Sequence, residues 1–260
     1  MIFNTHTHLN DKAFRDNYKE VIEKSLDMGM RLVVVGYDFE SSVSAINIAE
    51  QFEGVYAAVG LHPTDSSVFT LKYMEQFNEL LKNPKVIAIG ECGLDFHWDT
   101  CPKDLQIDSF NYQIELAIKH DLPLIVHSRD SIEETYNLLA AHGTIKGIMH
   151  CYSGSVEMVH RFLNLGMYIS LAGPVTFKNA KTPKEVAKHV PIEKLLVETD
   201  CPYLTPHPFR GKENRAYFIT YVVDEIARLR EMTSDQVAEA TWENANNIFG
   251  LKEWLLWKKY

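Results

Sequence analysis

Eight short apolar runs, separated by segments with helical spacing, are the feature that most limits how this chain can fold. The runs cover residues 1–8, 31–37, 55–62, 86–91, 122–127, 147–150, 167–173 and 194–200. Most are rich in β-branched residues and apolar almost throughout, which is typical of parallel strands covered on both faces. Eight alternations of strand and helix predict an α/β fold in which the sheet closes into a (β/α)8 TIM barrel.

Helices are predicted where apolar residues recur at three- and four-residue spacing between the runs. The clearest segments are 16–29, 70–83, 107–120 and 155–166, and the tail predicts two more helices within 217–230 and 234–250. No Gly- or Ser-rich linker and no break in composition marks a boundary. We therefore expect residues 1–260 to form a single domain.

Composition excludes some classes of function. The formal charge of −9, from 35 acidic and 26 basic residues, argues against a protein that coats duplex DNA by bulk electrostatics. It allows a nucleic-acid enzyme whose positive field is local and comes from metal ions. No apolar run reaches the length of a membrane span, and the N-terminus lacks the pattern of a signal peptide. The four scattered cysteines, without a C-x-x-C motif, indicate reduced thiols in a cytoplasmic protein. No obligate protein partner is evident from the sequence.

Two histidines, His6 and His8, stand two positions apart in the first run. Alternate side chains of a strand share a face, so both imidazoles can chelate a metal such as zinc. Such a pair in isolation is more often two ordinary histidines. A metal site therefore needs partners from other runs.

Those partners stand at the ends of four further runs. The complete set of predicted ligands is His6, His8, Glu91, His127, His150 and Asp200. Any one of these histidines could be a satisfied core residue, but the carboxyl ends of barrel strands meet on one face, where active sites form. Six such side chains predict two divalent ions, either Mg²⁺, Mn²⁺ or Zn²⁺.

Metal-assisted hydrolysis is the chemistry that this set indicates. Glu91, in the middle of the ring, is expected to bridge the two ions, which together can activate a shared water and hold both oxygens of an in-line displacement. Asp200 can bind one ion and accept the proton of the attacking water. Glu91 and Asp200 are therefore the predicted catalytic residues.

Seven motifs also carry a resemblance to a known family: "NTHTHLN", "GLHP", "IGECGLDF", "IVHSRD", "HCYSG", "ETDCPYLTP" and "RGKEN". In order and spacing they resemble the TatD family of metal-dependent deoxyribonucleases, which belongs to the amidohydrolase superfamily of barrels. The resemblance runs essentially from end to end. It implies one metal held by His6, His8, Glu91 and Asp200, and another held by Glu91, His127 and His150.

The sequence departs from the family pattern at two places. Asn4 stands where the family usually has aspartate, so a carboxylate that would strengthen an imidazole ligand is expected to be missing. Asn214, Arg215 and Ala216 replace the usual N-E-P, which weakens what the resemblance implies about the loop near the substrate.

Three residues are candidates for binding the substrate. His62 ends the third run and could contact a phosphate or be a buried histidine held by a carbonyl. Arg129 could pair with a phosphate or with Asp130 or Glu133. Arg210 belongs to a short basic stretch that could equally be a solvated loop. The aromatic cluster 96–98 could stack an unpaired base.

The leading functional prediction is phosphodiester hydrolysis on DNA, from a 3′ end or on single strands, as the resemblance implies. Ester hydrolysis on a D-aminoacyl-tRNA is the first alternative, because the same centre could attack a carbonyl. A small-molecule amidohydrolase and a metal-binding module without catalysis are the others.

Overall fold

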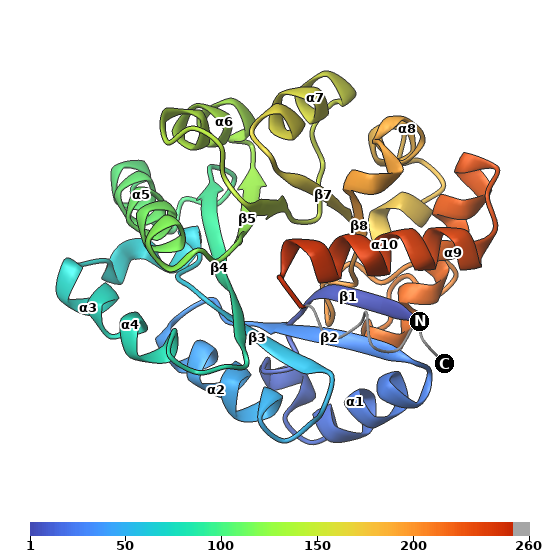
Figure 1. The fold of residues 1–260 in the computed structure, drawn as a ribbon, viewed down its shortest axis with the longest axis horizontal. Helices are drawn as coiled ribbons and strands as arrows, with labels where there is room; N and C mark the ends of the chain where they lie inside the picture. Colours follow the sequence, from blue (N-terminus) through green and yellow to red (C-terminus); the bar gives the residue numbers. More distant parts are fainter. Residues whose placement is uncertain (252–260) are drawn as a thin grey trace.

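A closed barrel of eight parallel strands forms the centre of the computed structural model, which describes residues 1–251 (Figure 1). Each strand pairs with the next along the chain, and β1 also pairs with β8. The strands are β1 (Ile2–Thr7), β2 (Met30–Val35), β3 (Val55–Val59), β4 (Val86–Asp95), β5 (Leu124–Arg129), β6 (Gly147–Met149), β7 (Tyr168–Leu171) and β8 (Leu195–Val197). The predicted (β/α)8 barrel is confirmed.

Helices connect the strands and cover the outside of the barrel, as Figure 1 shows. The α-helices are α1 (Tyr18–Asp27), α2 (Phe39–Ala49), α3 (Leu71–Glu75), α4 (Phe77–Leu80), α5 (Lys103–His120), α6 (Ile132–Ala141), α7 (Val156–Asn164), α8 (Thr182–His189), α9 (Ile219–Arg230) and α10 (Ser234–Ile248). Short 3-10 turns are η1 (Lys12–Phe14), η2 (Pro63–Val68), η3 (Gly173–Thr176), η4 (Ile192–Lys194) and η5 (Ala216–Phe218).

Several predicted boundaries differ from the structure. The single helix expected within 70–83 is divided into α3 and α4, and the fourth strand is longer than its apolar run because it continues to Asp95. The first, third, sixth and eighth strands stop before His8, His62, His150 and Asp200. These side chains therefore project from the first residues of the loops, at the carboxyl ends of the strands. Residues 252–260 of the predicted domain lie outside the described part of the chain.

The core has two parts. Between the sheet and the outer helices lies a large apolar layer, and inside the barrel a smaller cluster contains Phe3 and Ile125 with Trp242 and Phe249 of the C-terminal segment. The Phe3 ring lies 5.8 Å from that of Trp242. In this way α10, which crosses the barrel in Figure 1, closes its amino-terminal end and leaves the carboxyl ends of the strands for chemistry.

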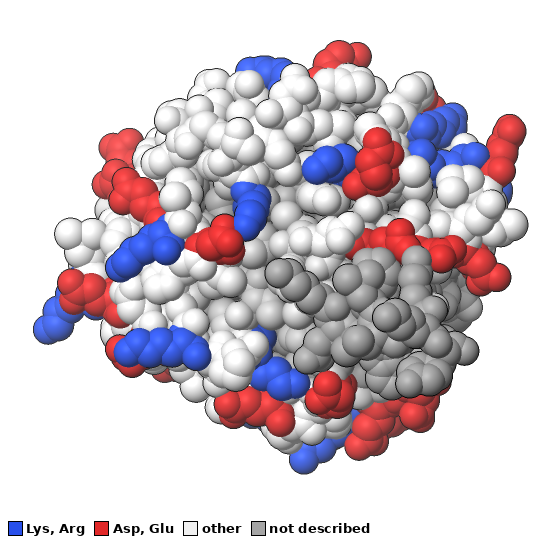
Figure 2. All heavy atoms as spheres, viewed as in Figure 1, with Lys and Arg blue, Asp and Glu red and all other residues white. Residues whose placement is uncertain are grey.

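The face closed by α10 shows no dominant charge. Lys and Arg side chains alternate with Asp and Glu side chains over the part of this face that is described (Figure 2). A mixed surface of this kind gives no support to a nucleic-acid interface at the amino-terminal end. Among the described residues, no helix is both long and apolar enough to cross a bilayer.

Glycine is required where β4 meets β5. Gly93 has a φ of +131°, and a Cβ at this position would lie 2.0 Å from the carbonyl oxygen of His127. Any larger residue would push the two strands apart. Since Glu91 and His127 belong to these strands, the close approach also fixes the spacing of two candidate metal ligands.

Candidate metal centre

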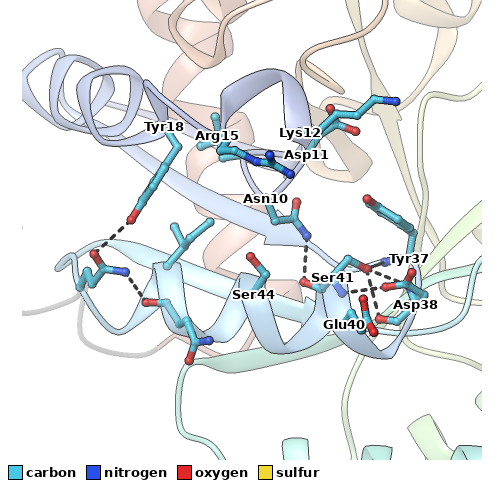
Figure 3. A pocket seen from close by; sticks show the side chains of 14 residues that line it. Asn10, Asp11, Lys12, Arg15, Tyr18, Tyr37, Asp38, Glu40, Ser41 and Ser44 are labelled. Carbon is cyan, nitrogen blue, oxygen red and sulfur yellow. Dashed lines mark hydrogen bonds between the residues drawn. The ribbon is translucent and has the colours of Figure 1, made fainter.

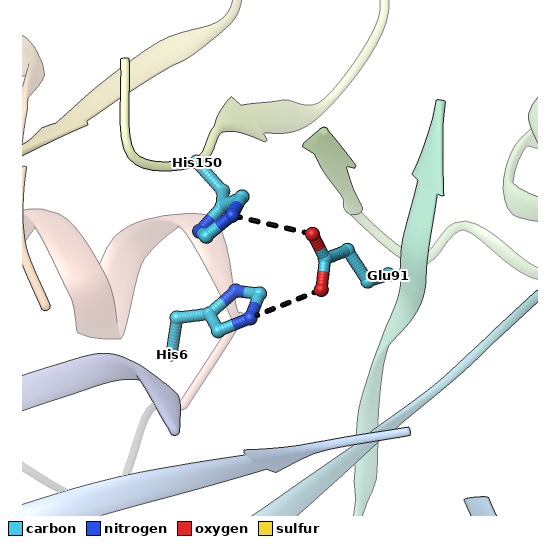
Figure 4. Close-up of side chains that lie close together, drawn as sticks. All are labelled: His6, Glu91 and His150. Atoms are coloured by element: carbon cyan, nitrogen blue, oxygen red, sulfur yellow. Dashed lines mark ion pairs between the residues drawn. The ribbon is translucent and has the colours of Figure 1, made fainter. Parts of the chain in front are cut away.

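Glu91 divides its two carboxylate oxygens between two groups of histidines. The residue lies in β4 and is 4% exposed. Its Oε2 atom faces His6 and His8, and its Oε1 atom faces His127 and His150. Figure 4 shows this division for His6 and His150, whose rings lie one above the other on the same side of the carboxylate, each facing a different oxygen. A carboxylate in this position can give one oxygen to each of two metals.

The first group surrounds Oε2 of Glu91. The Nε2 atoms of His6 and His8 lie 3.1 Å apart, and each is 3.4 Å from this oxygen. Oδ1 of Asp200 lies 3.7 Å from Nε2 of His6 and 3.4 Å from Nε2 of His8. Two imidazole nitrogens and two carboxylate oxygens therefore converge on one point.

The second group surrounds Oε1 of Glu91. Nδ1 of His127 lies 3.0 Å from this oxygen, and Nε2 of His150 lies 3.2 Å from it. The His6 and His150 rings are stacked with their centroids 3.8 Å apart, so the two groups are in contact. The structure thus brings all six predicted ligands together.

Both histidines of the second group have a carboxylate behind them. Nε2 of His127 lies 3.0 Å from Oδ2 of Asp95, and Nδ1 of His150 lies 2.8 Å from Oε1 of Glu198. A carboxylate that accepts the outer N–H of an imidazole fixes its tautomer and strengthens the inner nitrogen as a ligand. Asp95 and Glu198 are both buried.

The role of Asp95 and Glu198 behind the histidines was not predicted from the sequence. Each stands an even number of residues from a predicted ligand, four after Glu91 and two before Asp200. In an extended chain this spacing puts side chains on one face. A second carboxylate on the same face as a predicted ligand was the pattern that could have identified both residues.

The first group lacks carboxylates of this kind. Nδ1 of His8 lies 3.1 Å from the carbonyl oxygen of Val35, to which it can donate. Nδ1 of His6 is buried and has no hydrogen-bond partner among residues 1–251. The two groups thus differ in how their imidazoles are supported.

The side chain of Asn4 joins β1 to the segments after β8 and does not support an imidazole. Its Nδ2 donates to Oγ1 of Thr199 at 2.8 Å and to the carbonyl oxygen of Ala216 at 3.3 Å, and its Oδ1 accepts from the backbone N–H of Thr199. An aspartate could not donate to the Ala216 carbonyl. The amide therefore ties β1 to the segments that follow β8.

The charges of the centre fit divalent metal ions. Burial acts to raise the pKa of Glu91. The surrounding groups outweigh burial and hold this pKa well below its usual range, and His150 and His62 have the largest effects among them. Burial also acts to raise the pKa of Asp200. The hydrogen bond from His8 is the largest of the effects that outweigh burial, and the pKa of Asp200 is lowered. Ionised carboxylates among imidazoles are a ligand set for zinc and similar divalent metals. The residues present therefore suit a metal.

His62 lies at the edge of the second group. Its Nε2 is 3.5 Å from Oε1 of Glu91, and its Nδ1 accepts the backbone N–H of Thr64 at 3.2 Å. Burial is the largest of the effects that lower the pKa of His62 to about 3, so its ring is neutral. With Nδ1 accepting, the proton is on Nε2. His62 thus points a donor into the centre, and no backbone carbonyl of the described chain accepts from its ring.

Arg129 is free of the two partners considered from sequence. Asp130 contacts His97 at 3.0 Å, and Glu133 pairs with Arg161 at 2.8 Å. The Arg129 guanidinium instead lies over the Trp98 ring, 5.4 Å from its centroid.

The neighbouring aromatic loop is also accessible, because the Trp98 side chain is 53% exposed. Oδ1 of Asp95 accepts the backbone N–H groups of His97 and Trp98. The carboxylate behind His127 therefore also shapes this loop. An exposed cation and an exposed ring thus stand beside the second group.

Arg210 does not reach the metal centre. Its guanidinium lies over the ring of Phe177, 3.7 Å from the centroid, in a separate pocket that none of the metal-centre residues lines. Of the three predicted substrate contacts, the structure places His62 and Arg129 beside the centre and Arg210 apart from it.

A polar cavity lies between residues 9–18, which follow β1, and residues 37–51, which include α2 (Figure 3). Its volume is about 470 Å³, and Asn10 and Tyr37 contribute to its wall. The Tyr37 ring is 5.8 Å from that of His8. Carboxylates and cations both line this cavity, so its charge selects no single class of ligand.

The fold and the site together define a class, the metal-dependent hydrolases that place imidazoles and carboxylates at the mouth of a (β/α)8 barrel. Within this class the chain belongs to the TatD family: the family model described as TatD related DNase matches residues 3–250.

Known relatives agree with this assignment. The chain is 46% identical to the uncharacterized metal-dependent hydrolase YabD of Bacillus subtilis, over 96% of this chain and 99% of that protein. It is similar to the solved structure of YJJV, a TatD homologue from Escherichia coli, with a TM-score of 0.89 and 29% identity over 96% of this chain and 98% of that one. An amidohydrolase from Saccharomyces cerevisiae shares the fold, with a TM-score of 0.80 and 18% identity over 95% of this chain and 99% of that one.

Proposed function

We propose that this protein is a deoxyribonuclease that hydrolyses phosphodiester bonds of single-stranded DNA from the 3′ end, with two divalent ions. The observation that carries the proposal is the division of Glu91 between two histidine groups, because paired ions suit the in-line displacement of phosphoryl transfer. The DNase description of the family model supports the choice of substrate.

The chain offers a distinct set of ligands to each ion. His6, His8 and Asp200 would hold one with Oε2 of Glu91, and His127 and His150 would hold the other with Oε1. When bound, the ions supply Lewis acidity and activate water at neutral pH. Nitrogen-rich donor sets favour Zn²⁺ over Mg²⁺ and Mn²⁺, which prefer oxygen ligands.

The proton and the phosphate are handled by residues at the opening of the centre. The Asp200 side chain is 12% exposed and its carboxylate is ionised, so it can accept the proton of the attacking water. The N–H of His62 donates to an oxygen of the substrate. Arg129, with no carboxylate partner among the described residues, pairs with a phosphate.

The test is an assay of the purified protein with Mg²⁺, Mn²⁺ or Zn²⁺ added. Its substrates are 3′-labelled and internally labelled single-stranded DNA, D-aminoacyl-tRNA and bis(p-nitrophenyl) phosphate. Release of 3′ mononucleotides in order along the strand, abolished in Asp200→Asn, supports the proposal. Cleavage of the aminoacyl ester without attack on DNA would assign the chain to the ester-hydrolase alternative.

A further inference from the structure

A second pocket opens on the same end of the barrel as the metal centre. Its volume is about 400 Å³, and it is formed by the loop between β7 and α8 and the loop between β8 and α9. Its lining residues are Phe177, Lys178, Asn179, Ala180, His207 and Arg210. Loops that follow barrel strands lie at the face where active sites form, so this pocket and the centre share one surface.

The pocket is held in a fixed position relative to the centre. The backbone N–H of His207 donates to Oγ1 of Thr176 at 2.8 Å, which joins the two loops. Gly173 packs so tightly against the segment after β8 that an added Cβ would lie 1.8 Å from the carbonyl oxygen of Leu204. That segment also contains Asp200, so it connects the candidate base to the pocket.

The lining carries positive charge and no carboxylate. Arg210, Lys178 and His207 are its ionisable residues. Within residues 1–251, the side chains of Lys178 and Arg210 take part in no ion pair. Phe177 stacks under the Arg210 guanidinium and orients it, while the N–H groups at its edge stay free. In a chain with a formal charge of −9, a concave site of this kind favours an anion.

We propose that this pocket binds a backbone phosphate of the DNA strand, at a nucleotide beyond the one cleaved at the metal centre. The inference rests on the proposed function and deepens it. Arginine presents a fork of donors that matches phosphate oxygens, and Lys178 adds a second charge. The enzyme then acts better on a strand long enough to reach the pocket than on a dinucleotide.

The test compares the double variant Lys178→Ala, Arg210→Ala with a control that also loses two charges, Lys82→Ala, Lys119→Ala. Lys82 and Lys119 are exposed and precede β4 and β5, at the opposite end of the barrel. Substrates are a twelve-residue oligothymidylate, a thymidine dinucleotide and bis(p-nitrophenyl) phosphate. Binding of the oligonucleotide to metal-free protein is followed by fluorescence anisotropy over a range of salt.

For the double variant we expect kcat/KM on the oligonucleotide to fall about ten- to a hundredfold, through KM, with both short substrates unaffected. The slope of log affinity against log salt should decrease by about 0.7, because one phosphate of the single strand is no longer neutralised by the protein. The control should match the parent protein. Equal kinetics on the long strand, or equal losses on all three substrates, would overturn the inference. Failure of the parent protein to cleave any DNA would instead refute the proposed function.

Discussion

Nδ1 of His150 lies 2.8 Å from Oε1 of Glu198, a carboxylate that is 0% exposed and also accepts the backbone N–H of Cys151 at 2.7 Å. Burial by itself lowers the pKa of His150, but Glu198 and Glu91 outweigh it and raise this pKa well above the usual value. A buried carboxylate therefore stands directly behind one candidate metal ligand.

Glu198→Gln should weaken metal binding at the His127 and His150 position by about tenfold, because the amide keeps the shape but removes the charge behind the imidazole. Isothermal titration of the metal-free protein with Zn²⁺ measures the effect. The exposed Glu193→Gln, five positions away, serves as the control. Unchanged affinity in Glu198→Gln would show that this carboxylate only completes the packing.

Asp200→Asn should fold and keep some metal, yet lose at least about a hundredfold in kcat, because the same position supplies a ligand and the proton acceptor. Single-turnover cleavage, with metal content measured in parallel, separates the two roles. Turnover near that of the parent protein would remove Asp200 from the proposed chemistry.

Glu91→Gln should reduce the occupancy of both metal positions together, since each receives one oxygen of this carboxylate. His127→Ala is the matched comparison and should affect chiefly one position. Metal analysis after equilibrium dialysis gives the stoichiometry of each variant. A loss at only one position in Glu91→Gln would reject the bridging role.

Arg129→Ala should leave both metal positions intact and reduce kcat/KM on DNA about ten- to a hundredfold, which corresponds to about 1.5 to 3 kcal/mol for a charge-assisted contact. The loss should be smaller on an uncharged ester. Because the Arg129 side chain has no carboxylate partner among the described residues, we expect little change in melting temperature. Equal losses on both substrates with a lowered melting temperature would make Arg129 a structural residue.

Metal binding should release protons and strengthen as pH rises. Burial lowers the pKa of His8, but Asp200 and Glu91 outweigh it and raise this pKa to about 10, so the imidazole carries two protons at neutral pH in the metal-free protein. A metal must displace the proton on the inner nitrogen. Titrations in buffers of different ionisation enthalpy count the protons. Zinc affinity independent of pH between 6 and 9 would contradict this expectation.

Much of the fold could be predicted because its signal is local. Apolar runs of four to eight residues followed by amphipathic segments recur through the chain, and only closure into a barrel gives eight such parallel strands neighbours on both sides. Exact ends were harder to predict. For example, β4 continues beyond its apolar run to Asp95, whose side chain is buried against His127 of the neighbouring strand.

The sequence alone determined the barrel and the six candidate ligands, since strand ends in a parallel barrel must meet on one face whatever the loops do. Only the tertiary structure decided which oxygen of Glu91 faces which histidines, that Glu198 and Asp95 stand behind two of them, and that Arg210 belongs to a separate pocket. These relationships join residues far apart in the chain, such as His150 and Glu198. They depend on packing between strands and loops, which no local pattern of residues records.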